Sequence, residues 1–161
     1  LAAMALPQYF KAVERSRMAE AVTLMDSIVK AQRRKFMQKN RYATDFRGLD
    51  VSLKGARRNR YFTDGDPETG EGGNGFWIDL SDFRFSLGFV RAYRAFDGNA
   101  NNHSLQYQYY LERKYQSDNV TCIAFNSAGR ELCADFCGID TPTLYCCNNG
   151  TSDWCPAPTD N

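Results

Sequence analysis

The chain has 161 residues and a mass of 18.3 kDa, a length typical of a single domain. Hydrophobic residues make up 43% and aromatic residues 14% of it, which suffices for a packed core and excludes global disorder. Twenty basic and nineteen acidic residues leave a net charge of +1, so the net charge gives no sign of a polyanionic partner. No apolar run approaches the roughly 20 residues that span a bilayer.

The near-neutral balance hides a strong polarity along the chain. Residues 1–40 carry a net charge of +5, residues 41–115 carry +1, and residues 116–161 carry −5. All six cysteines lie in the last 40 residues: Cys122, Cys133, Cys137, Cys146, Cys147 and Cys155. This distribution predicts a basic start, a mixed middle and an acidic, cysteine-rich end within one domain.

The basic start predicts one long amphipathic helix, because residues 8–40 contain no glycine or proline. Apolar residues recur there with the helical period, and Gln32 is the one polar interruption of their stripe. Polar residues such as Glu14 are expected mostly outside this stripe, and Asn40 is expected to cap the helix. The stripe consists of Met18, Ala21, Val22, Met25, Ile28, Val29 and Phe36.

The front of this helix has a different character. Residues 1–6 are apolar all round, and Pro7 is expected to kink the helix rather than end it. A helix over residues 1–40 would be roughly 60 Å long, whereas a compact domain of this size is about 40 Å across. An apolar tip that projects from the domain predicts a contact with a membrane or another protein. The alternative is that residues 1–7 fold back or fray.

The middle of the chain predicts an antiparallel sheet. Aromatic and β-branched residues alternate over residues 75–80, 83–96 and 104–115, with turns between these segments. They predict a meander of three or four strands, which together with the long helix makes an α+β fold. Before the sheet, Asp45 is expected to cap a short turn that carries Phe46 and Leu49 inward.

Residues 120–138 predict a β-hairpin whose turn is centred on residues 127–128. Walking outward from this turn places Cys122 opposite Cys133, with Cα atoms about 4.5–5.5 Å apart and therefore within disulfide range. Cys122–Cys133 is our first-choice bridge. If Cys133 lies instead on a turn that leaves the strand, a Cys122–Cys137 bridge becomes the alternative.

The other cysteines leave their pairing open, because six cysteines allow 15 connectivities. Adjacent cysteines rarely bond each other, so Cys146 and Cys147 are each expected to pair with Cys137 or Cys155. The spacings do not form the paired C-x2-C pattern of a zinc site, so disulfides in an oxidising, extracytoplasmic compartment are expected.

Three fragments of chemical motifs occur, and none is complete. The glycines of residues 70–75 match a dinucleotide fingerprint, but a strand rather than a helix follows them. Residues 64–68 begin like an EF-hand loop whose later positions do not fit, which leaves only a looser calcium site as an alternative. His103, the only histidine, is expected to lie in a solvated loop. We therefore expect no enzyme, no bound metal and no cofactor.

A small basic and aromatic patch contains Arg57, Arg58 and Arg60 beside Tyr61 and Phe62. Grooves for single-stranded nucleic acid combine these residue types. One short patch on a near-neutral protein is more typical of a solvated edge, so nucleic acid is not expected as a partner. The three arginines remain the candidate ligand patch of the chain.

Three stretches resemble the type IV pilin family. Residues 1–22, LAAMALPQYFKAVERSRMAEAV, resemble the part of a pilin just after its membrane-buried start, where an apolar run ends in A-L-P-x-Y. Residues 36–51, FMQKNRYATDFRGLDV, are similar to the helix-to-loop crossing of pilins and of type II secretion pseudopilins. Residues 119–138, NVTCIAFNSAGRELCADFCG, resemble the cysteine hairpin near the end of many pilins.

The resemblance implies a pilin roll in one structural domain. Residues 1–40 would be the pilin helix, and residues 1–7 would be the end of its filament-core segment. Residues 41–161 would be the globular head, with residues 116–161 as a disulfide-rich C-terminal region. The filament-core and assembly contacts would be Leu1, Met4, Leu6, Pro7 and Tyr9. Mature pilins begin with a methylated aromatic residue and have a glutamate nearby. The resemblance therefore implies that about fifteen residues that precede Leu1 in pilins are missing here, roughly the number needed to extend the apolar start to the length that spans a bilayer.

The implied function is that of a non-enzymatic structural subunit of an extracellular type IV pilus or pilus-like filament on a bacterial surface. Its implied partners are further copies of the chain, the assembly machinery, and the inner membrane as the site of the precursor before assembly. The alternatives are a pseudopilin of a type II secretion system, or a minor pilin that binds DNA or a host ligand.

The charge polarity predicts contacts between copies independently of this resemblance. The basic helix of one subunit is expected to face the acidic tail of its neighbour, through Arg33, Arg34 and Lys35. Charge reversal at these three positions is expected to impair assembly and to leave the fold intact.

Overall fold

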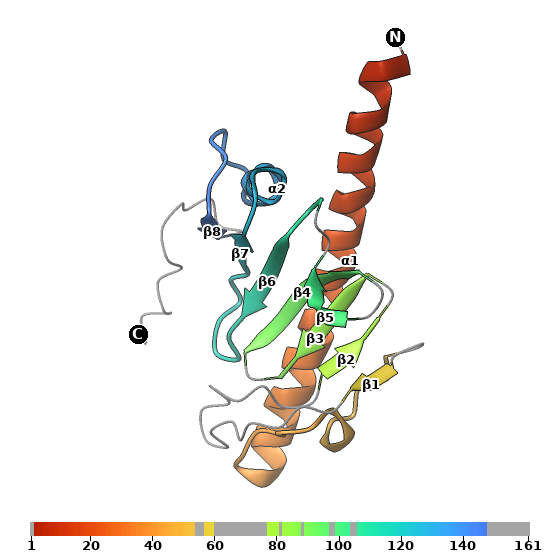
Figure 1. Cartoon of the computed structure of the whole chain (residues 1–161). Coiled ribbons are helices and arrows are strands. Elements are labelled where there is room, and N and C mark those ends of the chain that lie inside the picture. The colour runs from red at the N-terminus through yellow and green to blue at the C-terminus, as the bar shows by residue number, and fades with distance from the viewer. Residues whose placement is uncertain are drawn as a thin grey trace.

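The computed structural model describes residues 2–53, 57–59, 77–80, 82–87, 89–96, 99–103 and 106–147. One long N-terminal helix packs on an antiparallel sheet (Figure 1). Two disulfides join described residues toward the C-terminal end. The predicted α+β class is confirmed at this level.

Helix α1 spans Ala2–Lys39, and Pro7 lies inside it without ending it. The helix ends as predicted at Asn40, which has a left-handed φ of 51° and whose backbone N–H donates to the Phe36 carbonyl at 2.7 Å. Within the described residues, no helix carries an apolar stretch long enough to cross a membrane.

The predicted capped turn follows α1. Its 3₁₀ helix η1 spans Phe46–Gly48, and the Asp45 carboxylate accepts a hydrogen bond from the Arg47 backbone N–H at 2.9 Å. Phe46 and Leu49 are both buried against the core, as expected. The turn therefore brings the chain from the end of α1 back toward the sheet.

The sheet has the strand order β1-β2-β3-β4-β6-β7-β8, all neighbours are antiparallel, and β5 pairs with β4 off this path. Residues 83–96 form two strands, β3 and β4, which the predicted meander of three or four strands allows. One expectation needs correction. His103 belongs to strand β5 rather than to a loop. The strands are β1 (Arg57–Asn59), β2 (Trp77–Asp79), β3 (Phe83–Ser86), β4 (Val90–Phe96), β5 (Asn99–His103), β6 (Tyr109–Arg113), β7 (Thr121–Ala124) and β8 (Tyr145–Cys147).

The predicted hairpin at residues 120–138 is wrong in its second half. Helix α2, Ser127–Cys137, occupies that half, and β7 pairs with β8 instead. The Asn126 side chain caps α2 by accepting from the Gly129 N–H at 2.7 Å, and Gly138 at φ 70° ends the helix. A Cβ on Gly129 would lie 2.4 Å from the Gln108 carbonyl oxygen, so this close approach of α2 to the sheet requires glycine.

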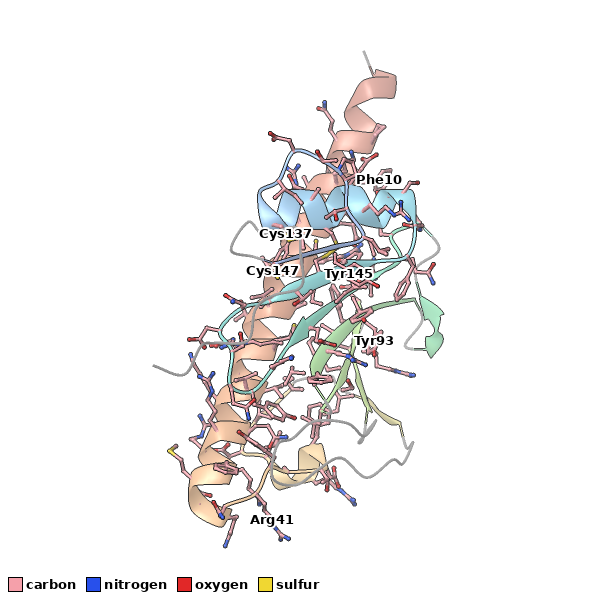
Figure 2. All side chains as sticks on the ribbon, turned by 90° about the vertical axis from the view of Figure 1, so that its left-hand side faces the viewer. Phe10, Arg41, Tyr93, Cys137, Tyr145 and Cys147 are labelled. Carbon is pink, nitrogen blue, oxygen red and sulfur yellow. A yellow bond between two sulfur atoms is a disulfide. The ribbon has the colours of Figure 1, made fainter. Side chains whose placement is uncertain are left out.

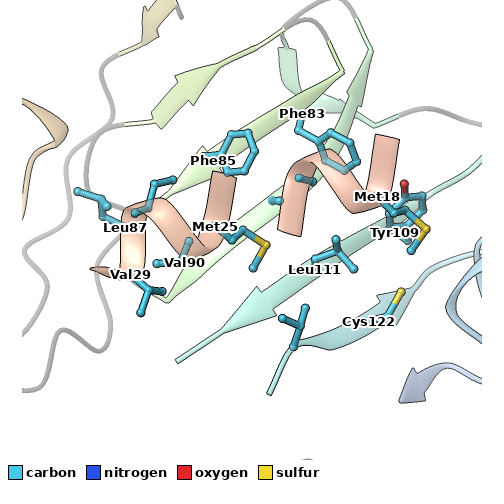
Figure 3. Packing of buried hydrophobic residues seen from close by; sticks show 14 of the residues in the cluster. Met18, Met25, Val29, Phe83, Phe85, Leu87, Val90, Tyr109, Leu111 and Cys122 are labelled. Atoms are coloured by element: carbon cyan, nitrogen blue, oxygen red, sulfur yellow. The ribbon is translucent and has the colours of Figure 1, made fainter. Parts of the chain in front are cut away.

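The core lies between α1 and one face of the sheet (Figure 3). Met18, Met25 and Val29 of α1 meet the inward side chains of the strands there. The register places one inward row side by side across the sheet: Phe85, Ala92, Leu111, Cys122 and Cys146, all fully buried. The predicted helical stripe is therefore the surface that holds α1 on the sheet.

Candidate functional site

The N-terminal part of α1 projects beyond the strands and beyond α2 (Figure 1). On it, the side chain of Tyr9 is 63% exposed and that of Phe10 is 45% exposed, and their rings meet edge to face at 5.9 Å. Free aromatic rings at the end of a rigid helix are typical of a surface that another molecule covers. This projecting segment is the candidate assembly site.

The predicted assembly residues lie in this same segment. Pro7 and Tyr9 are exposed, as a filament contact requires. Leu1 and the side chains of Met4 and Leu6 lie outside the described part of the chain. The structure thus brings the described members together on one helical turn.

A buried ionic cluster clamps α1 where it reaches the sheet. Glu14 is only 1% exposed, and its two carboxylate oxygens accept hydrogen bonds from Nε and Nη2 of Arg94, both at 2.8 Å. Arg17 also donates to this carboxylate, and the Tyr109 hydroxyl donates to it at 3.4 Å. The expectation that Glu14 lies outside the buried stripe is therefore wrong.

The cluster changes the ionisation of Glu14. Burial by itself raises the pKa of this carboxyl, but the hydrogen bonds from Arg94 and Arg17 lower it, and the net pKa lies below the usual value of 4.5. Glu14 is therefore a buried carboxylate with bidentate pairing, not a candidate proton donor. A sequence signal existed, since Glu14 precedes Met18 by four residues and so continues the buried stripe.

Helix α2 braces the candidate assembly site from the side. It packs against α1, and the ion pairs Lys11–Glu131 and Arg15–Asp135 join the two helices just after the projecting segment. Both pairs are solvent-exposed, so they add little stability and mainly orient the helices. Phe10 lies directly above α2 in Figure 2.

Two disulfides hold this brace on the sheet. The predicted Cys122–Cys133 bridge is present and joins β7 to α2, with Cα atoms 5.4 Å apart. A second bridge, Cys137–Cys146, joins the end of α2 to β8, which is one of the pairings left open by the sequence. Cys147 is also disulfide-bonded, and Cys155 lies outside the described residues.

Two of the three predicted inter-subunit charges are used inside the chain. The Arg33 side chain donates to the Tyr115 carbonyl at 2.8 Å and to Asp118 at 3.2 Å. Arg34 makes two hydrogen bonds of 2.8 Å to the carboxylate of Asp50. Charge reversal at these arginines would therefore remove contacts within the chain as well as any contact between copies.

The predicted ligand patch and the two loop motifs cannot be placed as sites, because most of their residues lie outside the part of the chain that the structure describes. Arg57 and Arg58 belong to β1, but their side chains, Arg60, and the loops at residues 64–68 and 70–75 lie outside the described part. Among the residues that are described, no group of three or more histidine, cysteine, aspartate or glutamate side chains is placed to hold a metal ion.

An aromatic row on the sheet face away from α1 was missed by the sequence analysis. The rings of Tyr93 and Tyr110 stack at 5.0 Å across β4 and β6, and Phe125 lies 5.6 Å beyond Tyr110. The guanidinium of Arg91 lies 5.6 Å from the Tyr110 ring centre. Tyrosine and arginine are enriched in protein interfaces, so this face is a second surface suited to contacts. Tyr93 is labelled in Figure 2.

Comparison with known proteins does not assign a family. No protein-family model, no curated protein and no solved structure matches this chain.

Proposed function

We propose that this protein is a structural subunit that polymerises into a type IV pilus or a pilus-like filament through the projecting end of α1. The observation that carries the proposal is the exposed pair Tyr9 and Phe10 on a helix whose other half is buried on the sheet. Full burial of one such side chain contributes about 1.5–3 kcal/mol. Packing of many copies around these rings therefore supplies a driving force for assembly.

The architecture supports the same proposal. One helix on an antiparallel sheet, with a cysteine-bridged region at its side, is compatible with the pilin roll implied by residues 1–22 and 119–138. The bridges also favour an oxidising compartment outside the cytoplasm.

The clamp at Glu14 supports assembly in a further way. A polymer of identical copies needs the same heterologous contact at every step, and therefore one fixed direction of its contact element. Bidentate pairing of Glu14 with Arg94 fixes how α1 sits on the sheet, and α2 braces the next turns toward the tip. The projecting helix is thus presented as a rigid arm.

Immunogold electron microscopy of filaments sheared from producing cells tests the proposal, with an antibody raised against this protein. We expect gold along long filaments. Unlabelled filaments, with the protein retained in the envelope fraction, would contradict the pilus proposal and favour the alternative, a pseudopilin of a type II secretion system.

A pair of matched variants tests the role of the projecting tip. Phe10→Ala is expected to lower the yield of sheared filaments strongly, because it removes half of the exposed aromatic pair. Phe125→Ala removes a phenylalanine that is 51% exposed in the aromatic row, the second candidate contact surface, and assembly through the tip predicts a yield closer to wild type for this variant. Equal yields from the two variants would contradict assembly through the tip.

A further inference from the structure

A hollow of ≈ 430 Å³ lies between the middle of α1 and strand β3, beside the segment that follows η1. Its volume falls within the range of about 300–1,000 Å³ that is usual for small-ligand sites. The described residues that line it include three from α1 and three from the facing side: Glu20, Ala21, Leu24, Leu53, Asp82 and Phe83.

The floor of this hollow is apolar and belongs to the core. Ala21 and Phe83 are almost fully buried, and Leu24 and Leu53 pack against the same core cluster. Phe83 lies beside α1 in Figure 3. Core side chains are close-packed and move little. The hollow is therefore a preformed apolar surface, which a ligand does not have to open first.

An ion pair ties the two sides of the hollow together. Nε of Arg17, on α1, lies 3.3 Å from the carboxylate of Asp82, which comes directly before β3. Arg94 lies 3.9 Å from the same carboxylate, and both arginines also bind Glu14. These two acids and two arginines balance each other, so the cluster adds no net charge to the hollow.

The charge that remains at the hollow belongs to Glu20. This side chain is exposed, and it takes part in none of the ion pairs that the described residues form. None of the described residues that line the hollow is basic. Once the paired charges are counted, the hollow therefore combines an apolar floor with one negative charge at its rim.

We propose that this hollow binds a small apolar molecule that carries one positive charge, such as an aromatic or alkyl ammonium ion. The apolar part of the ligand lies against Ala21, Leu24 and Phe83, and its ammonium group faces the carboxylate of Glu20. Removal of apolar surface from water supplies most of the affinity. The exposed carboxylate selects the charge of the ligand.

The same features disfavour an anionic ligand. A carboxylate or phosphate would bring a second negative charge beside Glu20, and it would meet no basic side chain among the described residues of the hollow. A neutral apolar molecule would bury the same surface but would gain nothing from Glu20. Positive charge is therefore the property by which this site distinguishes ligands of similar shape.

This binding site goes beyond the proposed filament contact and does not depend on it. Glu20 follows Phe10 by ten residues, which corresponds to about 15 Å along a helix. The hollow lies beside the sheet, whereas the tip of α1 projects beyond the strands (Figure 1). Contacts at the tip therefore do not use the residues of the hollow.

NMR titration of the purified chain tests the proposal with two probes of similar shape. Phenethylammonium carries the positive charge at neutral pH, and phenethyl alcohol is its neutral counterpart. We expect both probes to shift the amide signals of Ala21, Leu24 and Leu53. The ammonium should bind about two- to fivefold more tightly, because an exposed charge pair contributes only modestly. Absence of shifts at these amides, or equal affinity of the two probes, would overturn the proposal.

A pair of variants identifies the carboxylate that selects the charge. Glu20→Gln removes the charge at the rim, so both probes should bind with equal affinity. Asp140→Asn removes the charge of an exposed acid that is not among the residues of the hollow, and should keep the preference for the ammonium. An unchanged preference in Glu20→Gln would overturn the role of Glu20. Because the free subunit is titrated, the result does not depend on whether filaments form.

Discussion

The two halves of α1 are equally helical, but they differ in what covers them. From Glu14 onward, the stripe of Met18, Met25 and Ile28 is buried on the sheet of the same chain. Before Glu14, Tyr9 and Phe10 stay exposed because the sheet does not extend that far. The difference teaches that an apolar stripe on one face of a helix predicts burial of that face against residues of the same chain. An end that is apolar all round predicts a partner from outside.

The largest effect is expected at the boundary between the halves. Glu14→Ala should lower the free energy of unfolding by about 3–5 kcal/mol, because it leaves Arg94 buried without its counter-ion. Urea unfolding measures this loss, and Glu20→Ala, at an exposed glutamate of the same helix, is the matched control. A loss as small as that of the control would mean that Glu14 is not a clamp.

The buried half and the projecting half are compared directly by two truncations. Met25→Ala should lower the free energy of unfolding by about 2–5 kcal/mol, because it opens a cavity in the core. Phe10→Ala should change it by only about 0.5 kcal/mol, although it removes more atoms, because the ring is exposed in the free subunit. Similar losses in thermal or urea unfolding would contradict the division of α1 into two halves.

A smaller effect is expected from pH. The folded pKa of Glu14 lies below 4.5, so its contribution is present above that pH and is lost as the pH falls through the folded pKa. The pKa values of Asp26, through hydrogen bonds from Lys30 and Arg113, and of Asp118, through Arg33, are lowered too. The thermal unfolding midpoint should therefore decrease as the pH is lowered below 4.5.

The variant Glu14→Gln measures how much of the pH dependence of stability comes from Glu14. Glu14→Gln keeps the shape but no longer titrates, so its midpoint should depend less steeply on pH in the acid range than that of wild type. Parallel pH profiles for the two proteins would assign the acid sensitivity to the surface aspartates alone.

The smallest effect on stability is expected at the exposed Arg34–Asp50 ion pair near the C-terminal end of α1. Arg34→Ala removes two hydrogen bonds to Asp50, but both side chains are solvated and the released charges regain water. The unfolding midpoint should barely move. A drop comparable to that of Glu14→Ala would show that burial does not explain the ranking of ion pairs in this protein.

Local patterns predicted several parts of this protein correctly. The long helix, its end at Asn40, the turn capped by Asp45 and the Cys122–Cys133 bridge all follow from residues that are close in sequence. Helical periodicity and capping act over one or two turns, so neighbouring residues carry the signal. The bridge was derived from a hairpin that does not form, so its success depends on spacing rather than on the predicted geometry.

Tertiary structure decided the rest. Helix α2 has local caps at Asn126 and Gly138 that the hairpin prediction did not use, but its place against β7 and β8 is set by the two disulfides and the close approach of Gly129 to Gln108. The burial of Glu14 depends on Arg94, which lies 80 residues away in sequence. No local pattern contains such a partner, because a buried charge is tolerable only where the fold supplies its counter-ion.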